Sequence, residues 1–450
     1  MAPKKKSVLL SLLSCGATYG SPDPGNAPPD TSSAWQDESA PRFSLYGQLT
    51  YVEQETMGFH APYSGPNSLS PSSARETVDA TLFAGARLWP GAELWINPET
   101  DQGSGLDNTQ GIAGFSSGEA YKVGSHPPYF RLQRAFVRET FNLGGDTHLA
   151  EAGPNQFAGT RAADRVVLTV GKFSVVDIFD TNQYAHDPRN DFLNWSVVDT
   201  GSFDYAADAW GYTVGAAAEW YEGSWALRAG VFDLSDVPNS RRLEPGFHEF
   251  QMVWEVERRY ELGGMQGRVM LTAFDSRGRM GLLDEAVDVA ETTDTPVNIA
   301  AVRSYRSRFG ASLNLEQPLS DNLGMFARTG KAAGNVEAYD FTDIDRTVTA
   351  GLSLKGAKWG RAKDTVGLAG VMNGASGARE RYLNAGGLGI LVGDGQLPHP
   401  GPEKILETCY NAALFPWFQL TLDYQHVTHP GYNRDRGPVS IFAVRAHLQF

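Results

Sequence analysis

The 450-residue sequence predicts an all-β fold, a transmembrane antiparallel β-barrel of about 16 strands with short periplasmic turns and long extracellular loops. Three observations predict it. The last strand candidate alternates apolar and polar residues, tight turns alternate with long loops, and no stretch approaches the roughly 18 consecutive apolar residues that a transmembrane helix needs. A sheet that has one apolar face and closes on itself accounts for all three.

The last strand candidate spans residues 439–450. At a period of two, its apolar face holds Phe442, Val444, Ala446, Leu448 and Phe450, and its polar face holds Arg445, His447 and Gln449. A soluble sheet shows the same alternation, but the terminal Phe is typical of the strand that closes an outer-membrane barrel. Because lipid leaves no water for an open sheet edge, we expect this strand to pair with the first one. We also expect the barrel-assembly machinery to be a partner that recognises it through Phe450.

Sixteen segments are strand candidates, with a length near ten residues. They are 42–53, 77–89, 92–97, 130–141, 165–173, 210–221, 225–232, 250–260, 268–275, 304–316, 322–330, 347–355, 365–372, 404–414, 417–425 and 439–450. Tight turns such as 90–91 and 415–416 alternate with long Gly, Asp and Asn-rich connections such as 176–209 and 374–403. The short side is expected to be periplasmic. One connection, 143–164, is long where a short turn is expected, and the sequence gives no role for it.

The N-terminus has the layout of a secretory signal peptide over residues 1–20. Lys4 to Lys6 form a basic region, an apolar stretch follows from Val8 to Leu13, and small residues come next. Residues 21–41 are rich in Pro, Ser, Asp and Gly and predict a disordered lead-in, so the barrel is expected to span 42–450. The cleavage site and the lipidation of Cys15 stay open.

Composition excludes several classes of function. The net charge of −14 argues against a nucleic-acid partner, because phosphate binding needs clustered Lys and Arg. Cys15 lies in the leader and Cys409 is the other cysteine of the chain, so neither a disulfide framework nor a structural zinc site is expected. We expect no cofactor and no bound metal.

Alternation turns one face of each strand candidate toward the barrel lumen. Within 304–316 this face holds Arg306, Arg308, Ser312, Asn314 and Glu316, and the same parity turns Arg228 and Arg328 inward. Such a wall offers donors and acceptors for hydroxyl groups and aromatic faces for sugar rings. The predicted channel-lining and sugar-binding residues are Arg87, Glu93, Trp95, Asn97, Arg134, Arg138, Arg306 and Arg308. The alternative is that the inward charges pair with one another and keep water in the pore.

The opposite parity predicts the residues that face lipid. In 210–221 they are Trp210, Tyr212, Val214, Ala216, Ala218 and Trp220. Trp and Tyr at both ends of this row indicate an aromatic girdle at the two membrane interfaces.

The third long connection, 176–209, mixes Asp, Asn and Arg with Phe192, Trp195 and Phe203 and is too apolar for a solvated tip. We therefore expect it to fold into the barrel as a constriction loop. Its candidate residues are Asp180, Asn182, Tyr184, His186, Asp187, Arg189 and Trp195.

Motifs typical of enzymes and ligand sites occur without their context. Gly114 to Gly118 match the nucleophile elbow, but a Gly-rich loop stands where that motif needs a strand. Gly387-Leu388-Gly389 begins a dinucleotide fingerprint, but Val392 replaces its third glycine. We therefore expect that the chain is not an enzyme.

Several segments resemble the carbohydrate-selective porins of Gram-negative outer membranes, the OprB family. They include ELWINPETDQGSGLDNTQGIAGFSSGEAYKVG, VGKFSVVDIFDTNQYAHDPRNDFLNW, GGLGILVGDGQLPHPGPEKILETCY and PGYNRDRGPVSIF, and the resemblance runs from about residue 43 to residue 450. It implies a sixteen-stranded barrel in the outer membrane of a Gram-negative bacterium, through which glucose and similar monosaccharides diffuse along a narrowed, partly sugar-binding channel. A general or anion-selective porin is the alternative, since inward arginines also attract anions. Which sugar, how strong the selectivity, and whether the barrel is a monomer or a trimer stay open.

Overall fold

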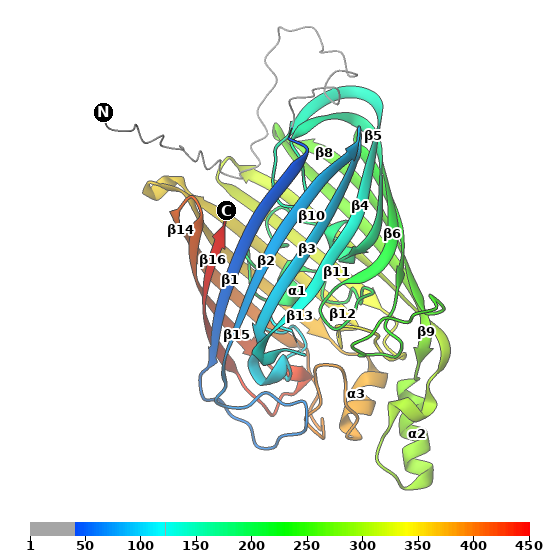
Figure 1. The fold of residues 1–450 in the computed structure, drawn as a ribbon. Helices are drawn as coiled ribbons and strands as arrows, with labels where there is room; N and C mark the ends of the chain where they lie inside the picture. Colours follow the sequence, from blue (N-terminus) through cyan, green and yellow to red (C-terminus); the bar gives the residue numbers. More distant parts are fainter. Residues whose placement is uncertain (1–40, 122) are drawn as a thin grey trace, which may run out of the picture.

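The computed structural model describes residues 41–121 and 123–450, so the predicted signal peptide and nearly all of the predicted lead-in lie outside the described residues. Sixteen antiparallel strands form one closed barrel, in which each strand pairs with its neighbours in sequence and β16 pairs with β1 (Figure 1). The predicted all-β barrel of sixteen strands is confirmed. No helix within the described residues is long and apolar enough to cross a membrane.

The strands are β1 (Phe43–Thr56), β2 (Ala74–Trp89), β3 (Ala92–Gly103), β4 (Ser125–Ala150), β5 (Gly159–Phe173), β6 (Thr213–Glu222), β7 (Trp225–Asp233), β8 (Phe250–Leu262), β9 (Met265–Met280), β10 (Ser304–Ser320), β11 (Leu323–Ala332), β12 (Arg346–Gly356), β13 (Arg361–Gly374), β14 (Glu403–Phe415), β15 (Phe418–Thr428) and β16 (Val439–Gln449). Each overlaps one of the sixteen strand candidates. The helices are η1 (Leu106–Asn108), η2 (Val175–Asp177), α1 (Trp195–Val198), α2 (Leu283–Thr293), η3 (Ile299–Val302), η4 (Ala357–Trp359), α3 (Gly377–Asn384) and η5 (Pro430–Tyr432).

The two faces of the sheet follow the predicted parity. On β10, Leu313 is 43% exposed, whereas its neighbours Ser312 and Asn314 are buried. On β16, Phe442 is 51% exposed and Arg445 is fully buried. The outer face is therefore apolar and the inner face polar, as a barrel in lipid requires.

Strands β1 and β16 close the barrel through backbone pairing that continues to the last residue. The Gly47 nitrogen donates to the Phe450 carbonyl at 2.7 Å, and the Phe450 nitrogen donates to the Gly47 carbonyl at 2.9 Å. A Cβ at position 47 would lie 2.7 Å from the Phe450 ring. Glycine at position 47 thus leaves room for the terminal aromatic ring at the seam.

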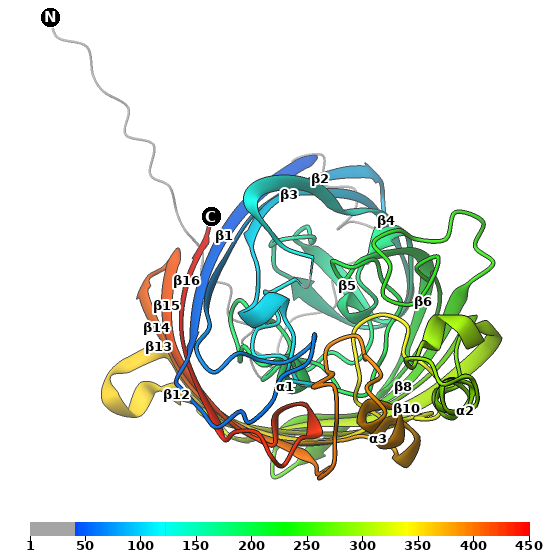
Figure 2. The ribbon, with the colours of Figure 1, turned by 90° about the horizontal axis from the view of Figure 1, so that it is seen from below.

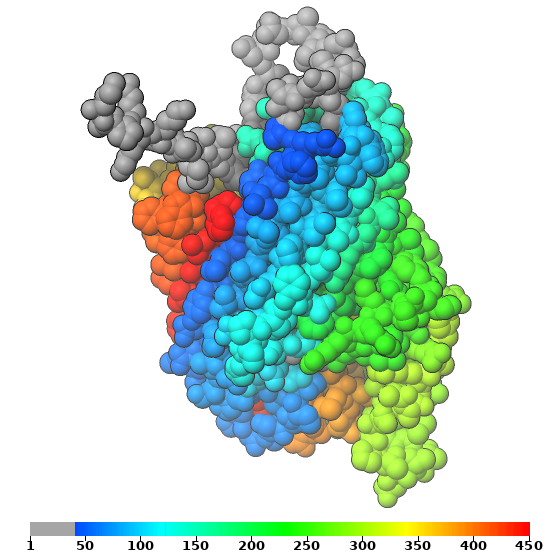
Figure 3. Space-filling view, viewed as in Figure 1, coloured from blue at the N-terminus to red at the C-terminus, as the bar shows by residue number. Residues whose placement is uncertain are grey.

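The two rims differ as expected. The short turns lie at one end of the barrel, which we call the short-turn rim, and the long loops lie at the other, the long-loop rim (Figures 1 and 2). Helix α2 protrudes from the long-loop rim (Figure 3, yellow-green). Helix α3 binds it there through Arg381, whose guanidinium lies 2.8 Å from the Asp288 carboxylate and 3.1 Å from that of Glu291.

Strands β4 and β5 continue past the short-turn rim as a hairpin, which accounts for the long connection 143–164. Their pairing runs from Asn142 opposite Arg165 to Ala150 opposite Gly159, with register shifts around Gly144. Gly144 has a φ of 140°, a conformation that favours glycine, and such irregularities bend a strand. The hairpin curves over the upper rim in Figure 1. We call residues 143–164 the rim hairpin.

The predicted lipid-facing row on β6 is wrong at its first end. Strand β6 begins at Thr213, and both Trp210 and Tyr212 are buried in the preceding loop. The Trp210 ring packs 3.5 Å under the Arg131 guanidinium, and its indole nitrogen donates to the Tyr129 hydroxyl at 3.1 Å. Trp220 at the other end is 39% exposed and keeps its outward position.

Candidate functional site

The loop between β5 and β6, residues 174–212, folds into the barrel. Its backbone forms hydrogen bonds with inward-facing side chains of the strands. The Asp180 nitrogen donates to the Glu255 carboxylate on β8 at 2.8 Å. On the opposite wall, the Leu193 nitrogen donates to the Glu407 carboxylate on β14 at 2.6 Å, and the Arg445 guanidinium donates to the Asp191 carbonyl at 2.9 Å. Figure 2 shows α1, part of this loop, inside the ring of strands. The predicted insertion of the loop is confirmed.

Asp180 and Asn182 hold this loop in place. The Asn314 side chain on β10 donates to the Asp180 carboxylate at 2.9 Å and accepts a bond of the same length from the Asn182 amide. The Arg328 guanidinium donates to the Val197 carbonyl and, at 2.7 Å, to that of Ala185. The hydrogen-bonding capacity of these groups serves to attach the loop to the wall.

The remaining candidates of the loop differ in role. The Tyr184 ring packs on Gly324, where a Cβ would come within 2.1 Å. The His186 ring nitrogen lies 3.8 Å from the Asp199 carboxylate. The Asp187 carboxylate accepts from the Arg189 backbone nitrogen at 3.0 Å. Arg189 itself reaches toward the wall.

The loop between β3 and β4, residues 104–124, meets the inserted loop inside the barrel. The Gly118 nitrogen donates to the Leu193 carbonyl at 2.7 Å, and the Trp195 nitrogen donates to the Phe115 carbonyl at 3.0 Å. The Phe115 and Trp195 rings stack at 5.1 Å with an interplanar angle of 14°. The two loops therefore form one body that fills part of the lumen.

A charged cluster lies where these loops reach the wall of β2 and β3. The Arg189 guanidinium lies 3.5 Å from the Asp79 carboxylate, 3.8 Å from that of Glu99 and 3.2 Å from that of Glu119. We call these four residues the constriction cluster. Burial raises the pKa of Glu119 well above its ordinary value, although Arg189 opposes the shift. With three carboxyl groups around one guanidinium, the cluster has no surplus positive charge.

The predicted sugar contacts at the short-turn end are occupied by the tip of the rim hairpin. The Arg87 guanidinium donates to the Ala158 carbonyl at 2.5 Å, and that of Arg138 donates to the Asn155 carbonyl at 2.5 Å. Arg138 also forms a 2.6 Å ion pair with Glu93. The Trp95 ring is fully buried, 5.1 Å from the ring of Phe157. In this structure Trp95 therefore offers no open ring face to a sugar.

The other predicted contacts also point inward and bind protein groups. The Arg134 guanidinium donates to both Asp177 carboxylate oxygens, at 2.8 and 2.6 Å. Arg308 pairs with Asp204 at 2.9 Å, with both side chains fully buried. Arg306 pairs with Glu285 of α2 at 2.9 Å. Asn97 is fully buried, and within the described residues neither atom of its amide has a hydrogen-bond partner.

Three members of the cluster, Asp79, Glu99 and Glu119, were missed as site residues, for different reasons. Glu99 continues the inward parity of Trp95 and Asn97 two residues beyond the strand candidate 92–97. Asp79 lies on the same face of its strand candidate as Thr81 and Arg87, so parity alone could have found it. Glu119 lies in a loop, and only the fold of that loop brings it to Arg189. Loop residues carry no parity signal.

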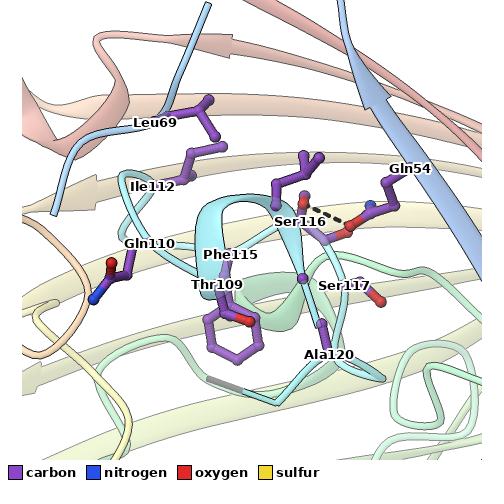
Figure 4. Close-up of a pocket in the computed structure, with 11 residues that line it drawn as sticks. Gln54, Leu69, Thr109, Gln110, Ile112, Phe115, Ser116, Ser117 and Ala120 are labelled. Atoms are coloured by element: carbon purple, nitrogen blue, oxygen red, sulfur yellow. Dashed lines mark hydrogen bonds between the residues drawn. The ribbon is translucent and has the colours of Figure 1, made fainter. Parts of the chain in front are cut away.

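Ser116 of the elbow-like motif has a structural role. Its hydroxyl donates to the Gln54 side chain at 3.0 Å, as Figure 4 shows. The cavity beside it, also lined by Leu69 and Phe115, has a volume of about 10 Å³. That is barely the space that one water needs.

Comparison with known proteins places the chain in a family. The sequence profile of the carbohydrate-selective porin family, OprB, matches residues 69–450, and no curated protein sequence matches the chain. The high-pH structure of Pseudomonas putida OprB superposes with a TM-score of 0.69 at 14% identity, covering 91% of this chain and 94% of that one. Its low-pH structure gives 0.48 at 12% identity, covering 90% and 92%, and the outer-membrane channel DcaP of Acinetobacter baumannii gives 0.49 at 11%, covering 91% and 97%. The chain belongs to the OprB family of carbohydrate-selective porins and is a channel protein of the Gram-negative outer membrane.

Proposed function

We propose that the channel passes monosaccharides and disfavours anions, and that the constriction cluster makes this selection. One observation carries the proposal: the single guanidinium of Arg189 faces the carboxyl groups of Asp79, Glu99 and Glu119 at 3.2 to 3.8 Å. A sugar hydroxyl accepts a hydrogen bond from a guanidinium such as that of Arg189, and the three buried carboxyl groups neutralise the charge of this guanidinium, so the site favours a neutral polyol. An anion that approaches Arg189 meets a guanidinium whose positive charge is already neutralised by three carboxyl groups.

Weak contacts suit such a channel. A hydrogen bond that replaces one to water contributes roughly 0.5–1.5 kcal/mol, and one to a charged group somewhat more. Arg189 keeps 13% of its side chain exposed, which leaves it within reach of a passing solute. A few bonds of this strength select a sugar and still release it.

The alternative, a general or anion-selective porin, has less support in the geometry. An anion filter needs guanidinium groups that are not neutralised. The inward Arg228 instead pairs with Glu219 at 3.2 Å, Glu255 at 2.7 Å and Glu257 at 2.8 Å. Arg308 is fully buried in its ion pair with Asp204. Inward arginines thus mainly stabilise the barrel, which agrees with the pairing alternative for these residues.

Swelling of proteoliposomes tests the proposal. Glucose and gluconate have similar size and hydroxyl content, but gluconate carries a negative charge. We expect rapid swelling with glucose and markedly slower swelling with gluconate. Equal rates, or faster swelling with gluconate, would contradict the proposal and favour the alternative.

We also propose that residues 1–20 direct export and that the barrel-assembly machinery recognises β16. Support for the second part comes from Phe450, which is 68% exposed beside the seam with β1. Phe450→Ser should lower the amount of heat-modifiable barrel in outer membranes, whereas Phe415→Ser, at the same rim, should not. Equal assembly of both variants would contradict a role for Phe450.

A further inference from the structure

A second cavity lies among the loops of the long-loop rim. It has a volume of about 80 Å³ and takes its lining from five loops: β3–β4, β5–β6, β7–β8, β11–β12 and β13–β14. No lining residue lies on a strand. Strands β4 and β12 are eight positions apart in a ring of sixteen, so loops from opposite walls meet here. The cavity therefore lies across the mouth of the barrel, and we call it the vestibule pocket.

Six aromatic side chains contribute to its walls. They are Phe115, Tyr121, Trp195, Tyr205, Trp210 and Phe341. The Phe115 and Trp195 rings stack at 5.1 Å, and the Tyr205 and Phe341 rings lie 5.2 Å apart. Tyr121 and Phe341 line the cavity and are half-buried, so each keeps some exposed surface. Flat apolar rings of this kind suit the C–H face of a pyranose.

Polar groups supplement the rings. Asp340 lines the pocket, is 7% exposed and accepts from the Ser235 hydroxyl at 3.1 Å through Oδ1. Its Oδ2 lacks a hydrogen-bond partner among the described residues. Burial raises the pKa of Asp340 well above its ordinary value, and the charge of Asp204 adds to this shift.

The pocket lies next to the constriction cluster. The Tyr121 hydroxyl lies 3.5 Å from the Glu99 carboxylate, and Gly118 and Ala120 of the lining flank Glu119. The pocket and the constriction cluster are therefore neighbours in the structure. By the same measure one water needs about 10–15 Å³, so the pocket of about 80 Å³ has room for several waters. This volume suits a single sugar ring and is too small for an extended oligosaccharide.

We propose that the vestibule pocket is a second carbohydrate site, which stacks the apolar face of one pyranose ring before the sugar reaches the constriction cluster. The proposal rests on the proposed function, because it requires that sugars use this channel. Stacking selects for a closed ring with a C–H face, which hydrogen bonds at the cluster do not. Selection at the pocket and selection at the cluster can therefore be measured separately.

Block of single-channel current by D-glucose and by D-mannitol tests this, with the full-length protein in planar bilayers. Mannitol carries hydroxyl groups but has no ring. Phe341→Ala removes one wall of the pocket, Phe341→Tyr keeps the ring, and Ala209→Phe fills the space without removing a packed side chain. Phe247→Ala, at an exposed ring of the β7–β8 loop outside the lining, is the matched control.

We expect Phe341→Ala and Ala209→Phe each to weaken glucose block several-fold, with mannitol block unchanged and Phe341→Tyr and Phe247→Ala like the wild type. Glucose block that persists in both variants would overturn the vestibule site alone. Equal loss of mannitol block would also overturn it, because stacking requires a ring. Absence of glucose block in the wild type would overturn the proposed function together with this site.

Discussion

Several inward arginines of this barrel bind the inserted loops to the wall through hydrogen bonds. Arg328 and Arg445 are both fully buried, and both donate to loop carbonyls. A buried charge is tolerated only when it is paired and hydrogen-bonded, so each arginine fixes the loop segment that supplies its partners. Arg189 differs, because it projects from a loop toward carboxyl groups of the wall. The residue that we assign to selection thus projects from a loop, whereas the arginines of the strands hold loops or pair within the wall.

Arg189→Gln should make the channel more selective for cations. The change leaves the carboxyl groups of Asp79, Glu99 and Glu119 without their guanidinium, so cations gain and anions lose. We expect the cation-to-anion permeability ratio, measured from the reversal potential in a KCl gradient, to rise several-fold and glucose block to weaken. Arg242→Gln is the matched control, since it removes the same charge from a side chain that is 76% exposed. Similar shifts in both variants would show that net charge and not the cluster sets selectivity.

Asp199 gives the inserted loop a dependence on pH. Burial, with the charge of Asp180, raises its pKa to about 8, although Arg328 opposes the shift. An unfolded Asp has a pKa near 3.9. Between about pH 4 and pH 8, Asp199 of the docked loop therefore keeps a proton that it would lose if the loop were released. Docking is therefore most stable at acid pH, and this contribution is gone above about pH 8. Burial lowers the pKa of the neighbouring His186, which stays neutral as the pH rises above 7.

We expect gating events in single-channel records to become more frequent between pH 7 and pH 9, which spans the Asp199 pKa of about 8. Asp199→Asn should remove this dependence because the amide does not titrate. An unchanged pH profile in the variant would exclude Asp199 as its source.

Among the elements, the rim hairpin covers part of the inner wall at the short-turn rim. Its tip places Phe157 against Trp95 and brings two carbonyl groups to Arg87 and Arg138. These contacts lie on the inner wall, so we expect the tip to narrow the path of ions at the short-turn rim.

Phe157→Ala should raise single-channel conductance, because it removes the ring that anchors the tip to the wall. Leu149→Ala, on the same hairpin at a side chain that is 75% exposed, should leave conductance unchanged. If the two variants conduct alike, the tip does not narrow the path of ions.

Strand β10 offers a test of the lipid-facing parity. Leu313 lies midway along the strand on the outer face. An Arg at the bilayer midplane costs roughly 2–4 kcal/mol, so Leu313→Arg should lower the yield of heat-modifiable barrel. Leu313→Met keeps an apolar side chain and should assemble normally. Equal yields would contradict the assignment of this face to lipid.

The strands and their faces could be predicted from the sequence, whereas parts of the loops could not. Alternation along β10 and β16 depends on local chain geometry and on the two solvents of the sheet, so strands and faces were predictable. Insertion of the β5–β6 loop followed from its mixed composition. The rim hairpin was not recognised, because its register shifts around Gly144 interrupt the alternation. Trp210 was assigned to lipid because it continues the alternating pattern of β6 in the sequence. The strand begins only at Thr213, however, so the alternation does not determine where Trp210 points.

At the scale of the whole molecule, the channel is made by loops that reach each other across a rigid ring. The β3–β4 and β5–β6 loops join and meet the wall at the constriction cluster, and loops from opposite sides meet at the vestibule pocket. The barrel fixes where each loop starts, while loop contacts decide what a solute meets. Similarity to Pseudomonas putida OprB at 14% identity thus establishes the fold, whereas the selecting residues have to be read from this chain.

The most direct test of sugar selection is single-channel current of the wild-type protein titrated with glucose and, separately, with phosphate at constant ionic strength. We expect glucose to reduce the current in a saturable manner, because we propose that sugars bind at the constriction cluster, and phosphate to have little effect, because carboxyl groups neutralise Arg189. Saturable block by phosphate without block by glucose would contradict the account and identify an anion channel.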